Sequence, residues 1–85
     1  MREITYTIRD EDGIHARPAG ILVKKMQEFT SQIIIKNGEK TADAKKLFQV
    51  MKLGVKCSNT IVVTAEGEDE EAAIAAAQTI LEGNL

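Results

Sequence analysis

The stretch Gln32-Ile33-Ile34-Ile35-Lys36-Asn37-Gly38-Glu39-Lys40-Thr41-Ala42 decides the fold. Its three consecutive isoleucines are typical of a β-strand, because β-branched side chains pack well on a pleated surface. The pair Asn37-Gly38 that follows is the strongest short signal for a β-hairpin. We therefore predict antiparallel strands at 32–36 and 39–42, joined by a tight turn.

Two more strands are predicted on either side of this hairpin. Ile4, Tyr6 and Ile8 alternate with polar residues, which is the pattern of a strand with one buried face. The cluster Asp10-Glu11-Asp12-Gly13 ends that strand. Residues Thr60 to Glu66 form another β-branched run. The chain therefore supplies four strands.

Three helices are predicted between and after these strands. The first follows His15, where apolar residues recur at helical steps: Ala19, Leu22, Val23, Met26 and Phe29. The second covers Ala44 to Leu53 and is closed by Gly54, a residue suited to the left-handed position after a helix. The third begins near the acidic residues 69–71, and its apolar face comprises Ala73, Ile74, Ala77, Ile80 and Leu81.

The predicted element order is β-α-β-β-α-β-α, within a single domain that spans residues 1–85. The hairpin and the handedness of strand connections favour an α+β fold. We expect an open-faced β-sandwich, in which a four-stranded, mostly antiparallel sheet carries three helices on one face. The sequence leaves the strand order open.

The composition is that of a soluble globular protein, with 44% hydrophobic residues, 28% charged residues and a net charge of −2. Because Cys57 has no internal disulfide partner and no apolar run has the length of a signal peptide or membrane span, we expect a cytoplasmic protein without membrane insertion. Residues 36–56 are basic and residues 57–85 acidic, which favours an acidic protein partner. Too few aromatic residues are present to predict binding to nucleic acid.

The candidate functional residues lie in Gly13-Ile14-His15-Ala16-Arg17-Pro18-Ala19. His15, the only histidine, comes directly before the first helix, whose unpaired amides and partial positive charge stabilise an anion. Arg17 adds a permanently charged, planar group that suits phosphate oxygens. This pattern predicts a phosphate-carrying imidazole. No metal site is predicted, because a lone histidine and a distant lone cysteine form no ligand pattern.

A hydrolase that uses His15 is disfavoured. We expect no carboxylate or thiol near the ring that would form a nucleophile and base pair with it. Cys57 is interpreted as an inert small hydrophobe.

The second helix presents more apolar surface than a core requires. Leu47, Phe48, Val50, Met51 and Leu53 sweep an arc of roughly 220°, about twice the stripe that faces a core. Part of this arc is expected to be exposed, although a short helix can also bury nearly all of its apolar side chains.

Two segments resemble the HPr family, the phosphocarriers of the bacterial phosphoenolpyruvate-dependent sugar phosphotransferase system. Residues 13–19 match its G-I-H-A-R-P-A signature without a substitution. Residues 45–54 match its second segment, a lysine before a hydrophobic helix that ends in V-M-x-L-G. The resemblance extends to the length and the predicted element order, so it covers essentially the whole chain.

The resemblance implies a carrier that turns over no substrate alone and uses no cofactor. Enzyme I, charged by phosphoenolpyruvate, would phosphorylate Nδ1 of His15, and a sugar-specific enzyme IIA would then receive the phosphoryl group. Arg17 would contact that group, and the amides near Ala16 and Arg17 would hold its oxygens. We expect a monomer. The docking face for both partners would comprise Gly20, Lys24, Lys45, Leu47, Phe48, Met51 and Lys52.

Lys46 departs from the pattern of many Gram-positive relatives, which carry a regulatory serine there. Lysine cannot accept phosphate or cap the second helix, so Asp43 or solvent must replace the cap. Lys52 also stands where serine is common, and Asp12 could tune the lability of a phosphorylated ring. One alternative function stays open: an HPr-like regulatory carrier of a nitrogen-related phosphotransferase branch, acting as a phosphorylation-dependent interaction module.

Overall fold

The computed structural model describes all 85 residues of the chain. It contains four strands and three helices: β1 (Arg2–Thr7), α1 (Ala16–Met26), β2 (Gln32–Asn37), β3 (Lys40–Asp43), α2 (Leu47–Lys52), β4 (Thr60–Glu66) and α3 (Glu70–Asn84). The predicted element order is therefore confirmed.

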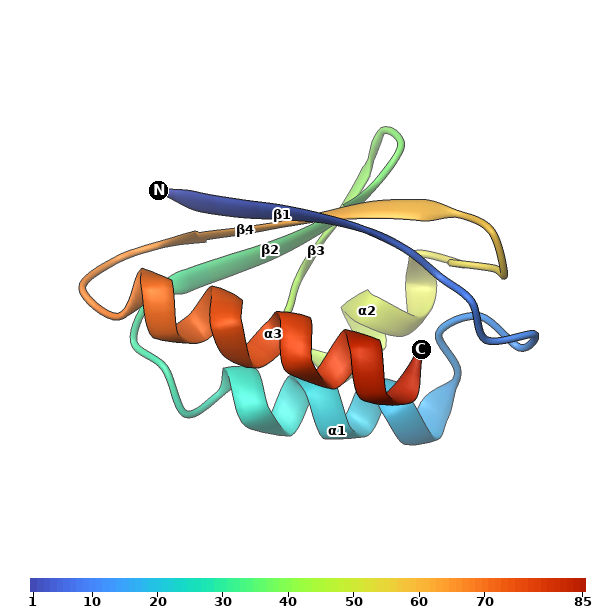
Figure 1. Ribbon diagram of the computed structural model, residues 1–85, viewed down its shortest axis with the longest axis horizontal. Coiled ribbons are helices and arrows are strands. Elements are labelled where there is room, and N and C mark those ends of the chain that lie inside the picture. Colours follow the sequence, from blue (N-terminus) through green and yellow to red (C-terminus); the bar gives the residue numbers. More distant parts are fainter.

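The strands form one sheet in the order β1-β4-β2-β3, and all neighbours are antiparallel (Figure 1). Strand β4 lies between β1 and β2, so Val63 pairs with Ile4 on one side and with Ile35 on the other. This placement suits its side chains, since Ile61, Val63 and Ala65 are all buried. Long-range pairing of β4 settles the strand order that local patterns leave open.

The hairpin between β2 and β3 turns one residue later than the Asn37-Gly38 pair predicts. Asn37 stays in the strand and pairs with Lys40, so the two turn residues are Gly38 and Glu39. Gly38 has a φ of +63°, which suits glycine at the first turn position. A contact distant in sequence accompanies the shift: the Asn37 side chain donates a hydrogen bond to the carbonyl oxygen of Leu53 at 3.1 Å.

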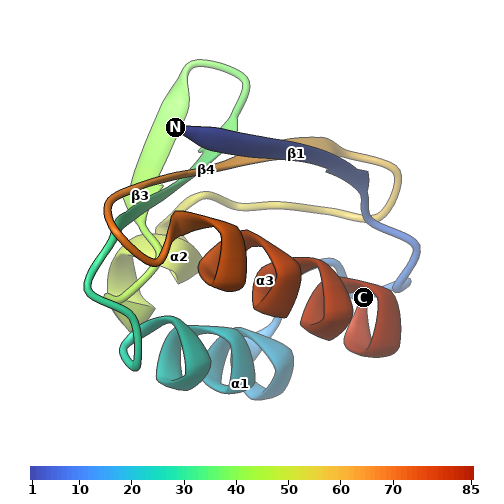
Figure 2. The ribbon, with the colours of Figure 1, turned by 60° about the vertical axis from the view of Figure 1, so that its left-hand side comes forward.

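All three helices cover the same face of the sheet, which confirms the predicted open-faced β-sandwich (Figures 1 and 2). Helices α1 and α3 pack side by side beneath the strands. The buried stripe of α1 comprises Pro18, Ala19, Leu22, Val23 and Met26. That of α3 comprises Ala73, Ile74, Ala77 and Leu81, whose alanines let the helix approach closely. No helix combines the length and the apolar character needed to cross a bilayer.

Helix α2 is shorter than predicted, because it begins at Leu47 instead of Ala44. Asp43 organises the preceding residues into a turn: its carboxylate accepts from the Lys45 amide at 2.9 Å, and its carbonyl accepts from the Lys46 amide at 3.0 Å. Lys46 occupies the N-cap with no side-chain hydrogen bond. At the other end, Gly54 has a φ of +61°, as predicted for the residue that closes this helix.

Asp69 ties the start of α3 to the loop before β2. Its carboxylate accepts hydrogen bonds from the Thr30 amide at 2.8 Å, from the Ser31 amide at 2.9 Å and from the Ser31 hydroxyl. These bonds favour the charged form, led by the bond from the Ser31 hydroxyl, and lower the pKa of Asp69 from 3.8 to about 2. The Asp69 carboxylate thus binds the loop before β2. It forms no capping hydrogen bond with the first amides of α3, although Asp69 occupies the N-cap.

Candidate functional site

His15 occupies the N-cap of α1, with an extended backbone at φ −104° and ψ 177°. Its side chain is 41% exposed and caps none of the helix amides. The ring is therefore accessible to solvent at the positive end of the helix, as the sequence pattern predicts.

Two main-chain amides at this helix start, those of Ala16 and Arg17, donate no hydrogen bond. Pro18 has no N–H, and the Ala19 amide already donates to the His15 carbonyl at 3.0 Å. The amides of Ala16 and Arg17 are thus the free donors that the first turn offers to an anion.

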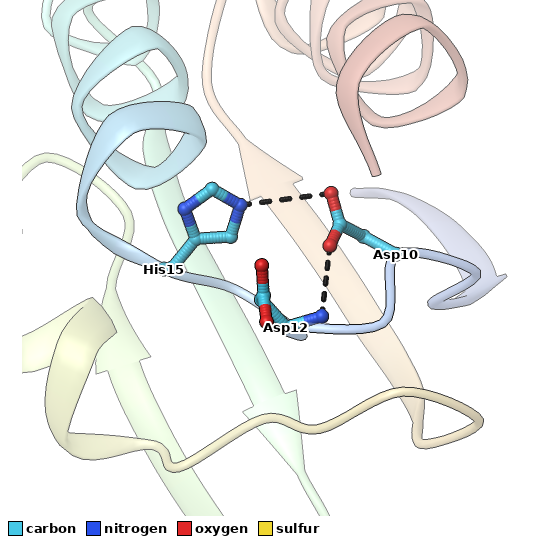
Figure 3. A group of neighbouring side chains, drawn as sticks. All are labelled: Asp10, Asp12 and His15. Carbon is cyan, nitrogen blue, oxygen red and sulfur yellow. Dashed lines mark hydrogen bonds and ion pairs between the residues drawn. The ribbon is translucent and has the colours of Figure 1, made fainter.

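The loop before the helix places two carboxylates beside the ring (Figure 3). Oδ2 of Asp10 lies 3.6 Å from Nε2 of His15, and donor atoms of Asp10, Asp12 and His15 all lie within 4.8 Å of one another. The expectation that no nearby carboxylate would pair with His15 was therefore wrong for Asp10, whereas Asp12 lies close to the ring as its place in this loop suggests. The ring forms no hydrogen bond with a hydroxyl or thiol, and the thiol of Cys57 instead lies 3.8 Å from the carbonyl oxygen of Arg9.

Gly13 explains how this loop folds back onto the ring. It has a φ of +66°, and an added Cβ would lie 2.2 Å from the Val55 carbonyl oxygen. The next amide, that of Ile14, donates to the same oxygen at 3.1 Å. The sequence predicts only that residues 10–13 end a strand. It does not predict their packing on Val55, because Val55 is distant in the sequence.

Arg17 lines an open cleft together with the ring. The cleft is formed by Asp10, His15, Arg17, Pro18, Ile21 and Asn84. The guanidinium of Arg17 makes no hydrogen bond or ion pair, so its donors are available to a ligand. Asn84 comes from the far end of the chain, and only the packing of α3 against α1 brings it here.

Comparison of this chain with known proteins identifies its family. A family model described as the PTS HPr component phosphorylation site matches residues 2–83. The chain belongs to the HPr family. The phosphocarrier protein HPr of Lysinibacillus sphaericus is 41% identical over 95% of this chain and 92% of its own length. The crystal structure of HPr-C-His from Thermoanaerobacter tengcongensis is 40% identical, with a TM-score of 0.93 over 98% of this chain and 93% of that one.

An HPr dimer from the same organism matches with a TM-score of 0.78 at 40% identity, over 98% of this chain and 95% of that one. The family membership and the antiparallel sheet agree with what the sequence resemblance implies. As a member of the HPr family, the chain is a phosphocarrier of the phosphotransferase system.

Part of the apolar arc of α2 is exposed, as its width predicts. The exposed fractions are 37% for Leu47, 80% for Phe48 and 37% for Met51, whereas Val50 is buried. Ile21 on α1 is 43% exposed as well and also lines the His15 cleft. Since α1 and α2 are in contact, this HPr carries an unpartnered apolar surface on the helices next to its histidine.

The polar members of the predicted docking face differ in availability. Lys24 and Lys52 are exposed. The ammonium of Lys45 instead donates to the Phe29 carbonyl at 2.6 Å, and the Lys45 carbonyl accepts from Gln27 at 2.9 Å. Gly20 has open space where a Cβ would lie. Lys45 therefore joins the segment that follows α1 to the residues that precede α2.

The same three side chains beside the helix start, Asp10, Asp12 and His15, are close enough to share a metal ion. The surroundings disfavour a cation there, because the positive end of α1 and the unpaired Arg17 guanidinium adjoin the group.

Proposed function

We propose that this HPr accepts a phosphoryl group from enzyme I on Nδ1 of His15 and passes it to a sugar-specific enzyme IIA. The observation that carries the proposal is the solvent-accessible ring at a helix start, beside the free amides of Ala16 and Arg17. The unpaired Arg17 guanidinium in the same cleft supports it. Together these donors suit the oxygens of a phosphoryl group.

The proposed chemistry needs few protein groups. The lone pair of Nδ1 attacks phosphorus while the bond between phosphorus and the donor breaks. The main-chain amides and Arg17 then stabilise the charge that spreads over the phosphoryl oxygens. Nε2 faces Asp10 and Nδ1 is turned away from it (Figure 3).

We further propose that enzyme I and enzyme IIA dock in turn on one face that includes Gly20, Lys24, Leu47, Phe48, Met51 and Lys52. Exposed apolar side chains on α2 give such a face a central contact, and the two free lysines give it a basic rim. One face that serves two partners requires transient contacts of modest area.

The proposed setting is the cytoplasm, where phosphoenolpyruvate is formed, and the proposed functional unit is the monomer. The exposed free thiol of Cys57 fits a reducing compartment. A monomer leaves the apolar face of α2 open to partners. Light scattering at working concentration tests this state, and a stable dimer that covers Phe48 would contradict it.

A two-stage transfer assay tests the proposed function. Enzyme I, phosphoenolpyruvate and magnesium should load the wild-type protein with phosphate that is labile in acid and stable in alkali, and His15→Ala should stay unloaded. The loaded carrier is then offered separately to a sugar-specific and to a nitrogen-related enzyme IIA. Faster transfer to the sugar-specific acceptor supports the proposal, and transfer to the nitrogen-related acceptor alone refutes its sugar branch.

A further inference from the structure

We propose that Asp10 is a positioning residue for His15, which keeps a proton on Nε2 and so leaves the lone pair of Nδ1 free. The inference rests on the proposed function, in which Nδ1 accepts the phosphoryl group. It concerns a residue that the sequence pattern assigns only to the end of a strand.

The geometry around the ring selects one tautomer. Oδ2 of Asp10 lies 3.6 Å from Nε2, and Nδ1 is turned away from it (Figure 3). An ionised carboxylate can only accept hydrogen bonds. The contact is therefore attractive when Nε2 carries the proton, whereas a lone pair on Nε2 would face the carboxylate charge. The other nitrogen of a neutral ring is then the nucleophile.

Asp10 is itself fixed by three hydrogen bonds that do not involve the ring. Its Oδ1 accepts from the Asp12 amide at 2.8 Å. Its own amide donates to the Leu85 carbonyl at 3.0 Å, and its carbonyl accepts from the Gly13 amide at 3.0 Å. A partner held in this way orients an imidazole at little cost in conformational entropy.

The same contact serves both halves of the transfer. When the bond between Nδ1 and phosphorus forms, the donor keeps the electron pair of the broken bond and the ring keeps its proton on Nε2. The ring then carries a positive charge that the Asp10 carboxylate offsets. In the onward step the bond to phosphorus breaks, its electron pair returns to Nδ1, and the neutral tautomer is restored. Neither step requires a proton to enter or leave.

Other charged groups near the ring provide a matched control. Asp12 brings a second carboxylate within 4.8 Å but shows no direct contact with Nε2, and Arg17 lines the same cleft. Asp10→Asn and Asp12→Asn remove the same charge from the same turn. Asn at position 10 retains an oxygen for the Asp12 amide, so the loop is preserved, and its NH₂ can donate to Nε2.

The test is ¹⁵N NMR of the histidine ring at a pH above its ordinary titration range. The wild-type protein and Asp12→Asn should show a protonated Nε2 and an unprotonated Nδ1. Asp10→Asn should shift the ring towards a proton on Nδ1 and accept phosphate from enzyme I about tenfold more slowly. Asp10→Ala, which cannot donate, should move the ring towards the mixture of an unconstrained imidazole.

Unchanged ring shifts in both Asp10 variants would overturn the inference, as would equal shifts in Asp12→Asn. These outcomes are distinct from failure of the proposed function. If enzyme I does not load the wild-type protein, the carrier role is refuted whatever the tautomer. If loading is normal but the tautomer of the ring is the same in the Asp10 variants as in the wild type, only the positioning role of Asp10 is refuted.

Discussion

Arg17 and His15 line the same cleft, yet the Arg17 guanidinium has no partner of its own in the protein. Because the Arg17 guanidinium forms no ion pair or hydrogen bond within the protein, it is available to stabilise a phosphoryl group during transfer. We predict that Arg17→Ala slows phosphoryl acceptance by roughly 100-fold, the scale of losing one charge-stabilising donor. Its free energy of unfolding should stay within about 0.5 kcal/mol of wild type, as for most surface substitutions.

Stopped-flow transfer from enzyme I and urea denaturation measure the two effects. Arg17→Lys, which keeps the charge but loses the planar fork, is the matched variant and should recover part of the rate. Equal rates for wild type and Arg17→Ala would show that the guanidinium has no part in the transfer.

Phe48 and Val50 separate docking from folding on one short helix. Phe48 is 80% exposed, whereas Val50 is 1% exposed. Phe48→Ala should raise the KM of enzyme I for this protein as its substrate and leave the free energy of unfolding nearly unchanged. Val50→Ala should cost about 2 kcal/mol of unfolding free energy, because it removes buried methyl groups and leaves a cavity. Steady-state kinetics with thermal denaturation provides the comparison, and an unchanged KM for Phe48→Ala would argue against the docking face.

Gly13 and Gly20 offer a second matched pair. The Cβ of an alanine at position 13 would lie 2.2 Å from the Val55 carbonyl oxygen at a φ of +66°, whereas a Cβ at position 20 would meet no neighbouring element within 4 Å. Gly13→Ala should destabilise the protein by about 2 kcal/mol or more and displace the loop that carries Asp10. Gly20→Ala should stabilise helix α1 by up to about 1 kcal/mol.

Urea denaturation of both variants is the measurement. Slower transfer to enzyme IIA by a more stable Gly20→Ala would locate that position in the partner contact. Wild-type stability of Gly13→Ala would contradict the tight packing of this loop on Val55.

The hydrogen bonds from Thr30 and Ser31 to the Asp69 carboxylate, called here the Asp69 clamp, should make part of the free energy of unfolding depend on pH. The pKa of Asp69 is lowered from 3.8 to about 2 in the folded protein, chiefly by the bond from the Ser31 hydroxyl. The unfolded chain therefore takes up the proton first as acid is added. The contribution of this group is present above its unfolded pKa and is lost as the pH falls towards about 2.

Asp69→Asn should remove this part of the pH dependence and lower stability near neutral pH. Glu68→Gln, which neutralises a neighbouring exposed acid that forms no hydrogen bond, is the control. Denaturation midpoints measured from neutral to strongly acidic pH compare the variants. A profile of Asp69→Asn that parallels wild type throughout would mean that the clamp contributes nothing.

Local patterns in the sequence were sufficient for the element order, the layer arrangement and the position of His15 at the start of α1. Hydrophobic spacing and glycine positions act over a few residues, so they can be interpreted along the chain. The turn at Gly38 and the late start of α2 were not predicted. Both depend on hydrogen bonds of the Asn37 and Asp43 side chains, and the spacing of residues in the sequence does not encode the geometry of these bonds.

The environment of His15 was only partly predictable. The helix start and Arg17 belong to one short segment, and both lie where the pattern indicates. The contact between Asp10 and the ring depends on a glycine turn that packs against Val55. Interactions of this kind join distant parts of the chain, so they emerge only with the fold.

Identification of the phosphorylated atom tests the central claim most directly. The protein is loaded by enzyme I and phosphoenolpyruvate, and the phosphate is then located by mass spectrometry and by ³¹P and ¹⁵N NMR. We predict a single phosphoryl group, bonded to Nδ1 of His15. Phosphate on Nε2 or on another residue, or a fully active His15→Ala variant, would contradict the account.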